Sequence, residues 1–183
     1  MLILASKSPR RQELLNLITP EFLVITQDTD ETILPELTPE KAVETLALRK
    51  ARAVAATHGA DVVIGADTVV ALGKNILGKP QDEAQALAML RTLCGKTHLV
   101  YTGVAILAPG LERVFCQQTA VTFWEMEEDW LCRYANSGEP LDKAGAYGIQ
   151  GTGALLVKKI EGDYFNVVGL PVSRLARELS GLF

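Results

Sequence analysis

The feature that most constrains this chain is a single carboxylate inside a long apolar run at residues 62–72. Two apolar stretches flank the tetrapeptide Gly65-Ala66-Asp67-Thr68, a pattern typical of a buried strand. A buried charge is costly unless a cation or a metal pairs with it, so Asp67 is predicted to have a functional role. The alternative is an acid at a strand end that caps the backbone of a neighbouring segment.

The rest of the chain mixes helical and strand patterns. Ser8-Pro9 and Thr38-Pro39 each place a capping residue before a proline, which predicts the start of a helix. Pro109-Gly110 predicts a turn between two antiparallel strands. Because other strands alternate with helices, we expect an α/β fold with a mixed sheet. Strands are expected at residues 2–5, 22–25, 62–72, 98–107, 113–123 and 154–160. Helices are expected from residue 9, at 39–56, 82–93 and 127–136, and from residue 171, while the glycine-rich residues 137–153 are expected to lack regular structure.

Composition limits the class of protein further. The 183 residues suit a single domain, 1–183, with a proper hydrophobic core or split into two lobes. A net charge of −4 argues against a positive potential over the whole surface that would bind nucleic acid. A role for basic residues is therefore judged from local clusters. We expect no membrane span, and the apolar N-terminal run is too short for a secretory signal, which favours the cytoplasm.

Cysteine and histidine are scarce. Cys94, Cys116 and Cys132 lack C-x-x-C spacing, which predicts buried reduced thiols instead of a disulfide framework or a zinc site. His58 and His98 fall in no metal-binding or triad pattern. The chemistry is therefore expected to depend on carboxylates, lysines and arginines.

An anion-binding site is predicted where the first helix begins, at Ser8, Arg10 and Arg11. The first turn of a helix offers free N–H groups and a partial positive charge, and arginine adds forked donors that suit phosphate oxygens. The alternative is a pair of exposed arginines with no ligand, and the motif alone does not decide between the two.

Further charged residues lie on the second helix and in the loop before it. Lys50 and Arg52 stand near the end of that helix, and taken alone they indicate a solvated helix end. Asp28, Asp30 and Glu31 make the segment 27–32 acidic, which indicates a solvated loop that could also supply a metal ligand. Neither group of residues indicates a function unless it is considered together with other motifs.

Two later segments complete the set of candidates. Gly78-Lys79-Pro80 holds a lysine in a turn between a strand pair and a helix, which suits a phosphate but also a plain exposed turn. The long segment 137–153 is typical of a binding loop, in which Gln150 could read a base edge and Tyr147 could stack or pack.

The separate motifs form an ordered set that spans nearly the whole chain. They are ASKSPRRQELL at 5–15, DE at 30–31, KAR at 50–52, GADT at 65–68, GKP at 78–80, YTGV at 101–104, SGEPLDKAGAYGIQG at 137–151 and VVGLP at 167–171. Each motif alone is weak, but together they are specific. The set resembles the Maf family of nucleoside triphosphate pyrophosphatases.

This resemblance implies an elongated, two-lobed α/β fold similar to that of inosine triphosphatase, with a twisted mixed sheet flanked by helices and a central cleft. It implies hydrolysis of a nucleoside triphosphate to the monophosphate and pyrophosphate, with a divalent cation, Mg²⁺ or Mn²⁺, as cofactor. Such an activity limits the incorporation of unwanted nucleotides. The family is also associated with cell-division arrest.

The resemblance also assigns roles to individual residues. Asp67 matches the proposed general base, and Glu31 matches an acid near the metal and the phosphates. Both are therefore candidate catalytic residues and candidate metal ligands, and the choice between a base and a metal-linked role for Asp67 stays open. The substrate-binding candidates are Ser8, Arg10, Arg11, Lys50, Thr68, Lys79 and Gln150.

Three of these positions indicate which nucleobase the hydrolysed nucleotide carries. In the branch that resembles dTTP/UTP pyrophosphatases, arginine follows S-P, threonine follows the key Asp, and glutamine stands in the late loop. This chain has Arg10, Thr68 and Gln150 at those places, so dTTP and UTP, or a modified pyrimidine nucleotide, are the expected substrates.

Several alternatives stay open. The 7-methyl-GTP branch, or another base, would keep the chemistry and change the substrate. A regulator that senses nucleotides without cleaving them would bind but release no pyrophosphate. Direct binding of nucleic acid is disfavoured by the net charge, and no membrane partner is expected. A homodimer is compatible with the sequence on general grounds.

Overall fold

The computed structural model describes residues 1–182, which form two compact units. The first unit contains Met1–Thr68, Thr102–Gln117 and the residues from Phe165 on. The second contains Val69–Tyr101 and Gln118–Tyr164. Three long strands contribute residues to both units: β3 (Val62–Leu72), β5 (Thr97–Ala108) and β6 (Leu111–Phe123).

The strands form one mixed sheet of seven strands in the order β2-β1-β3-β5-β6-β7, with β4 added to β3. β1 (Leu2–Leu4) pairs in parallel with both β2 (Leu23–Val24) and β3. β4 (Asn75–Leu77) pairs antiparallel with β3, and β7 (Val157–Glu161) pairs antiparallel with β6. The predicted α/β fold with a mixed sheet flanked by helices is confirmed.

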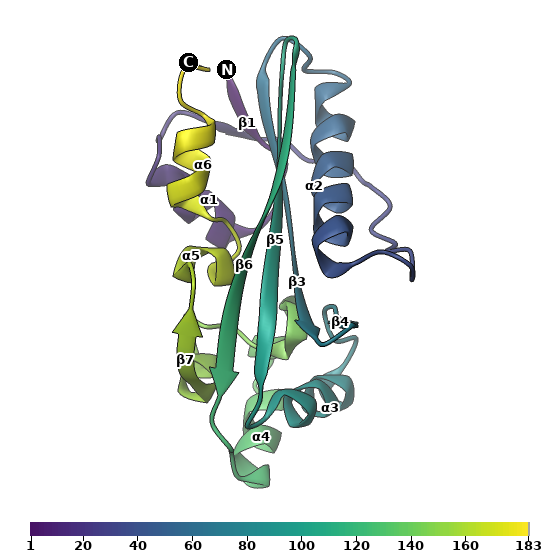
Figure 1. Cartoon of the computed structure of the whole chain (residues 1–183), viewed down its shortest axis with the longest axis vertical. Helices are drawn as coiled ribbons and strands as arrows, with labels where there is room; N and C mark the ends of the chain where they lie inside the picture. The colour runs from purple at the N-terminus through teal and green to yellow at the C-terminus, as the bar shows by residue number, and fades with distance from the viewer. Residues whose placement is uncertain (183) are drawn as a thin grey trace. The chain divides into compact units, whose positions relative to one another are not determined.

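In the first unit, helices cover both faces of the strands. The long helix α2 (Pro39–Ala55) lies on one side, and α1 (Pro9–Asn16) and α6 (Val172–Glu178) lie on the other (Figure 1). The helix α2 begins as its sequence predicts, with the Thr38 hydroxyl accepting from the backbone N–H of Lys41 and proline following directly. Its apolar residues recur at helical spacing and are buried: Ala42, Val43, Leu46, Ala47, Ala51 and Val54.

Two glycines allow α2 to pack unusually close to the sheet. A Cβ atom on Gly65 of β3 would lie 2.2 Å from the carbonyl oxygen of Ala47, and one on Gly103 of β5 would lie 2.4 Å from that of Val43. Both obstacles are helix backbone, which cannot rotate away as a side chain can. The glycines therefore determine how far α2 stands from β3, and so how the side chains of the helix meet those of the strand.

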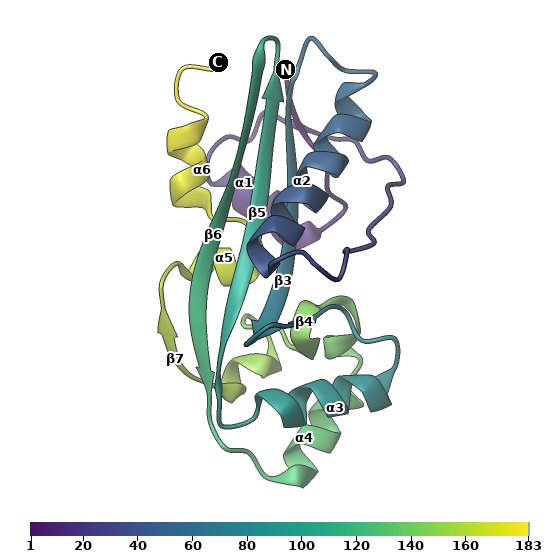
Figure 2. The same ribbon diagram turned by 45° about the vertical axis from the view of Figure 1, so that its right-hand side comes forward.

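The second unit contains the α-helices α3 (Glu83–Leu93) and α4 (Glu128–Ala135), which both views show (Figure 1 and Figure 2), and short 3₁₀ turns. The helix α3 begins at Asp82, whose carboxylate accepts from the backbone N–H of Gln85. The glycine-rich segment predicted to be irregular contains the 3₁₀ turns η1 (Glu139–Asp142) and η2 (Ala144–Ala146) and the start of η3 (Thr152–Leu156). That prediction is correct for α-helix and strand but overlooks these turns.

Some local predictions are wrong. Ser8 stands at the N-cap of α1, but its side chain makes no capping hydrogen bond. The last strand begins at Val157 instead of residue 154, because the preceding residues form η3. The helix α5 (Tyr164–Val168) was not predicted, and β4 was expected only as part of a strand pair before Gly78, without bounds, because periodicity is weak over so few residues. The three cysteines are free, but they are half-buried instead of buried. Among residues 1–182, no helix is long and apolar enough to cross a membrane.

The core of the second unit holds a buried histidine. The His98 ring packs edge-on against Phe123 and Tyr147, with ring centroids 4.8 and 5.4 Å away. Its Nε2 lies 2.8 Å from the Tyr147 hydroxyl, and its Nδ1 is buried without a hydrogen-bond partner among the described residues. Burial lowers the pKa of His98 to about 4. His98 is therefore neutral in the folded protein at neutral pH.

This histidine makes stability depend on pH. The pKa of His98 is lower when folded than when unfolded, so the contribution is complete above the unfolded value and is lost as pH falls toward about 4. We expect the free energy of unfolding to fall by roughly 2 kcal/mol between about pH 7 and about pH 5 from this residue. Urea unfolding at both pH values measures the change. In His98→Gln the drop should shrink by that amount, and in His58→Gln it should stay as in the wild type; equal drops in both variants would contradict the assignment.

Candidate active site

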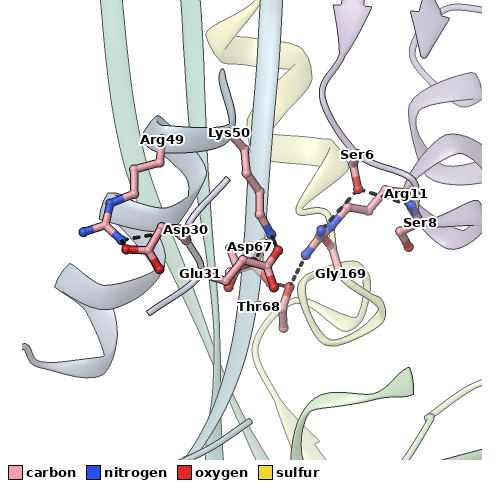
Figure 3. Close-up of polar contacts among 11 residues, drawn as sticks. Ser6, Ser8, Arg11, Asp30, Glu31, Arg49, Lys50, Asp67, Thr68 and Gly169 are labelled. Atoms are coloured by element: carbon pink, nitrogen blue, oxygen red, sulfur yellow. Dashed lines mark hydrogen bonds and ion pairs between the residues drawn. The ribbon is translucent and has the colours of Figure 1, made fainter. Parts of the chain in front are cut away.

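The site is built around adjacent residues of β3, Asp67 and Thr68, whose side chains project to opposite faces of the strand. Asp67 faces α2, where its Oδ1 accepts a hydrogen bond from the Nζ of Lys50 at 2.5 Å (Figure 3). Both side chains are largely buried, with 15% and 16% of their surfaces exposed. The cation that a carboxylate in this apolar strand requires is therefore Lys50.

A second carboxylate reaches the same ammonium group. Glu31 Oε1 lies 2.8 Å from Lys50 Nζ, although 61% of the Glu31 side chain is exposed. Lys50 thus links an acid on the strand to an acid on the loop that precedes α2. The structure brings these three predicted residues together, and the reading of Lys50 as part of a solvated helix end does not hold.

Arg49 anchors the loop that carries Glu31, and it was not predicted. Its Nη1 donates to the backbone carbonyl oxygens of Asp30, at 3.2 Å, and Thr32, at 3.1 Å. The Asp30 carboxylate in turn accepts from the backbone N–H of Thr32 at 2.8 Å, and hydrogen bonding from the side chain and the backbone of Thr32 lowers the pKa of Asp30. The bonds from Arg49 hold the backbone on both sides of Glu31. The only sequence signal for this role is the position of Arg49 next to Lys50.

On the other face of β3, Arg11 makes a set of specific hydrogen bonds from α1. Its Nε donates to the carbonyl oxygen of Gly169 at 2.8 Å, its Nη1 to the Ser6 hydroxyl at 3.3 Å and its Nη2 to the Thr68 hydroxyl at 2.9 Å. Burial lowers the pKa of the Arg11 guanidinium, and the charge of Asp67 partly offsets this. These bonds use three of the five N–H donors of a guanidinium, so two are left for an anion.

A chain of hydroxyl groups orients Thr68. The Thr102 hydroxyl, which is buried, donates to the carbonyl oxygen of Asn166 at 2.9 Å and has no second hydrogen to give. The 2.9 Å contact between Thr68 and Thr102 must therefore be donated by Thr68, whose oxygen is left to accept from Arg11. The Thr68 hydroxyl therefore uses its hydrogen to bond Thr102 and its oxygen to bind Arg11. Its predicted role in substrate binding stays a prediction.

The remaining candidates of the first unit lie at the start of α1. The backbone N–H of Ser8 donates to the Ser6 hydroxyl at 3.3 Å, and its half-buried side chain does not cap the helix. Arg10 is also half-buried and adds positive charge beside Arg11. The first turn of α1 contains no acidic residue, so the positive end of the helix and both arginines act in the same sense.

Two candidates belong to the second unit, and both are exposed. Lys79 lies in the turn between β4 and α3, and Gln150 lies in the glycine-rich segment. The backbone N–H of Gly145 donates to the carbonyl oxygen of Gly78 at 3.0 Å, which ties the Lys79 turn to that segment. Tyr147, considered for stacking on a ligand, is instead buried against His98 and Phe123.

The acids of the first unit suit a hard divalent cation. Mg²⁺ usually binds through one or two carboxylates together with phosphate oxygens and water. Asp67 and Glu31 supply two carboxylates that already converge on one cationic atom, Lys50 Nζ. Among residues 1–182, no group of three or more histidine, cysteine or acidic residues is placed to hold a metal. The donor set therefore fits a cation that shares its ligands with a phosphate group.

The family model described as Maf-like protein matches residues 1–182. The chain belongs to the Maf family. A Maf relative named dTTP/UTP pyrophosphatase, from Geobacillus sp. (strain WCH70), is 55% identical over 181 residues, which are 99% of this chain and 97% of that protein. Another with the same name, from Bacillus cytotoxicus, is 53% identical over 177 residues, which are 97% of this chain and 93% of the relative.

Solved structures relate the Maf fold to that of Ham1 proteins. The Ham1 protein of Staphylococcus aureus matches with a TM-score of 0.57 at 17% identity, covering 100% of this chain and 99% of that one. A HAM1 protein from Coxiella burnetii matches with a TM-score of 0.54 at 12% identity, covering 98% of both chains. At such low identity these matches establish the fold alone.

Proposed function

We propose that this protein is a nucleoside triphosphate pyrophosphatase that hydrolyses dTTP and UTP to the monophosphate and pyrophosphate. The observation that carries the proposal is the convergence of Glu31 and Asp67 on Lys50 in a chain of the Maf family. The names of the relatives with 55% and 53% identity support the choice of bases. By limiting the pool of unwanted nucleotides, this activity would act in nucleotide metabolism, and a link to cell division is part of the same proposal.

The reaction requires water to attack the α-phosphorus while pyrophosphate leaves. Such a transition state depends on charge neutralisation and in-line positioning more than on covalent catalysis. Lys50 and Arg11 carry positive charge beside Asp67, and we assign them, with Lys79, to the phosphate oxygens. Arg11 is held by three hydrogen bonds and is therefore oriented before a substrate binds. Ser8 and Arg10 extend the same anion site at the start of α1.

Asp67 is the residue that we assign to the attacking water. Its carboxylate accepts a hydrogen bond from Lys50 and has further lone pairs that can accept a proton from water. Asp67 and Glu31 are also the residues that would hold Mg²⁺ or Mn²⁺. When bound, that cation would neutralise charge on the phosphate oxygens and lower the pKa of a coordinated water.

The decisive experiment is pyrophosphate release from a panel of ribo- and deoxyribonucleoside triphosphates, with and without Mg²⁺. Metal-dependent release that favours dTTP and UTP is the expected result. Release that favours 7-methyl-GTP or another base would keep the reaction and reject the assigned bases. Nucleotide-dependent stabilisation without release from any triphosphate would reject the enzyme in favour of a sensor.

Base selection is assigned to Gln150, with Arg10 and Thr68 as the companion positions. Gln150→Glu replaces an amide donor with a carboxylate, so a contact to the pyrimidine edge is lost and a charge is added. We expect kcat/KM for dTTP and UTP to fall by about tenfold or more, since a lost hydrogen bond in a polar site costs roughly 1–3 kcal/mol. Steady-state rates across the nucleotide panel measure this.

Gln118→Glu is the matched control, because Gln118 is an exposed glutamine of the same unit. It should leave the relative rates as in the wild type. If Gln150→Glu also left them unchanged, Gln150 would have no part in selecting the base.

A further inference from the structure

The glycine-rich segment of the second unit is folded around one carboxylate, that of Glu139. Its Oε1 accepts from the Tyr134 hydroxyl at 2.9 Å and from the backbone N–H of Gly153 at 3.1 Å. Its Oε2 accepts from the backbone N–H of Thr152 at 3.0 Å. Because three hydrogen-bond donors point at this half-buried carboxylate, Glu139 holds the surrounding backbone in place and does not act as a solvated surface charge.

Tyr134 connects Glu139 to the other end of the same loop. While its hydroxyl donates to Glu139, its oxygen accepts from the backbone N–H of Gly148 at 3.1 Å. The backbone is therefore held at Gly148 on one side and at Thr152 and Gly153 on the other. Between these points lie residues 149–151, in which Ile149 is buried and Gln150 is exposed.

Three glycines of the segment allow it to pack closely around the side chains of Glu139, Tyr134 and Lys143. A Cβ on Gly148 would lie 2.5 Å from Cε of Lys143, and one on Gly151 would lie 2.7 Å from Oε1 of Glu139. A Cβ on Gly153 would lie 2.4 Å from both the Tyr134 hydroxyl and the carbonyl oxygen of Gly148. The loop therefore wraps the Glu139 carboxylate and the Tyr134 hydroxyl with no space for a side chain at Gly151 or Gly153, whereas the flexible Lys143 side chain could move away from Gly148.

The charge state of Glu139 suits this role. Burial alone would raise the pKa of the Glu139 carboxyl, but hydrogen bonds from Gly153, Tyr134 and Thr152 and the charge of Lys143 lower it overall. Lys143 itself donates to the carbonyl oxygen of Glu139 at 2.6 Å and to the carboxylate of Asp142 at 2.7 Å. The carboxylate of Glu139 is therefore ionised at neutral pH and free to accept from the loop.

Gln150 has no side-chain hydrogen bond to any other described residue, so its position depends on the backbone alone. We propose that Glu139 and Tyr134 are positioning residues that hold the loop around Gln150 and thereby set the selectivity for the nucleobase. The proposal rests on the proposed function, in which Gln150 reads the base. It goes beyond that function because neither residue is assigned to touch the substrate.

The test uses Glu139→Gln in the full-length protein. The substitution keeps the size of the side chain but replaces one acceptor oxygen with an NH₂ group that faces N–H donors. We expect KM for dTTP and UTP to rise about tenfold and their preference over other triphosphates to fall similarly, while kcat changes less than about threefold. Inhibition by inorganic tripolyphosphate, which has no base, should stay unchanged.

Tyr134→Phe is the second variant, since it removes only the hydroxyl that bridges Gly148 and Glu139. It should shift KM and selectivity in the same direction. Glu83→Gln, an exposed acid of the same unit, is the matched control and should behave as the wild type. Unchanged selectivity in both folded loop variants, or an equal loss of kcat on every nucleotide, would overturn the proposal.

Amide hydrogen exchange separates this proposal from the proposed function, because it needs no substrate. The amides of Gly148, Thr152 and Gly153 should exchange at least about tenfold faster in Glu139→Gln than in the wild type. Unchanged exchange would overturn the positioning role whatever the activity. Faster exchange in a protein whose wild type cleaves no nucleotide would support the positioning of the loop and reject the proposed function.

Discussion

Asp67→Asn is expected to lower the turnover of dTTP by about 10³-fold while the protein stays folded. General acid–base catalysis contributes roughly 10²–10⁴-fold, and an amide can neither accept the proton nor supply the negative charge. The fold should survive because the amide oxygen can still accept from Lys50, whose charge stays paired with Glu31. Pyrophosphate release in the presence of Mg²⁺, together with thermal unfolding of the same sample, measures both effects.

The matched control is Asp61→Asn, which makes the same change just before the same strand. Asp61 pairs with the N-terminal ammonium group, and an exposed ion pair of this kind contributes little stability. This variant should keep wild-type turnover. Wild-type turnover in Asp67→Asn would show that Asp67 serves only to pair with Lys50, and the catalytic assignment would then be wrong.

Gly65→Ala is expected to destabilise the protein by about 3 kcal/mol or more, at the upper end of the cost of overpacking a core. The new Cβ would stand 2.2 Å from the carbonyl oxygen of Ala47 and 2.8 Å from the backbone nitrogen of Ala51, so α2 has to move away from β3. The melting temperature should fall by roughly 10 °C. Urea unfolding of the variant gives the change in free energy directly.

Turnover of Gly65→Ala should fall as well, even at a temperature where the variant is folded. Lys50 lies on α2 between Ala47 and Ala51, and Asp67 lies two residues from Gly65 on the same face of β3, so a shift of the helix separates them. Gly59→Ala is the control, since its Cβ would meet only the carbonyl oxygen of Ala55 at an ordinary 3.4 Å. It should change the free energy of unfolding by less than about 1 kcal/mol. Equal stability of both variants would show that the close approach of α2 is not needed.

Much of the fold follows from local sequence patterns. The apolar runs on both sides of Asp67 correspond to one long strand, β3, and the Thr38-Pro39 pair begins α2 as predicted. These predictions succeed because hydrophobic periodicity and capping chemistry act between residues a few positions apart. They fail for α5 and the 3₁₀ turns and give no bounds for β4, because these elements are too short to show a period.

For the candidate site too, some features could be predicted from the sequence and others only from the tertiary structure. The sequence by itself determined that Asp67 needs a cation, because a charge in an apolar strand is costly without one. Only the tertiary structure decided that the cation is Lys50, that Arg49 holds the Glu31 loop, and that Arg11 is anchored to the carbonyl of Gly169 at the far end of the chain. Such contacts join residues distant in sequence, and they depend on how closely each helix packs on the sheet and which face each residue presents. The spacing of apolar residues along the chain does not specify that packing, so these contacts could not be predicted from it.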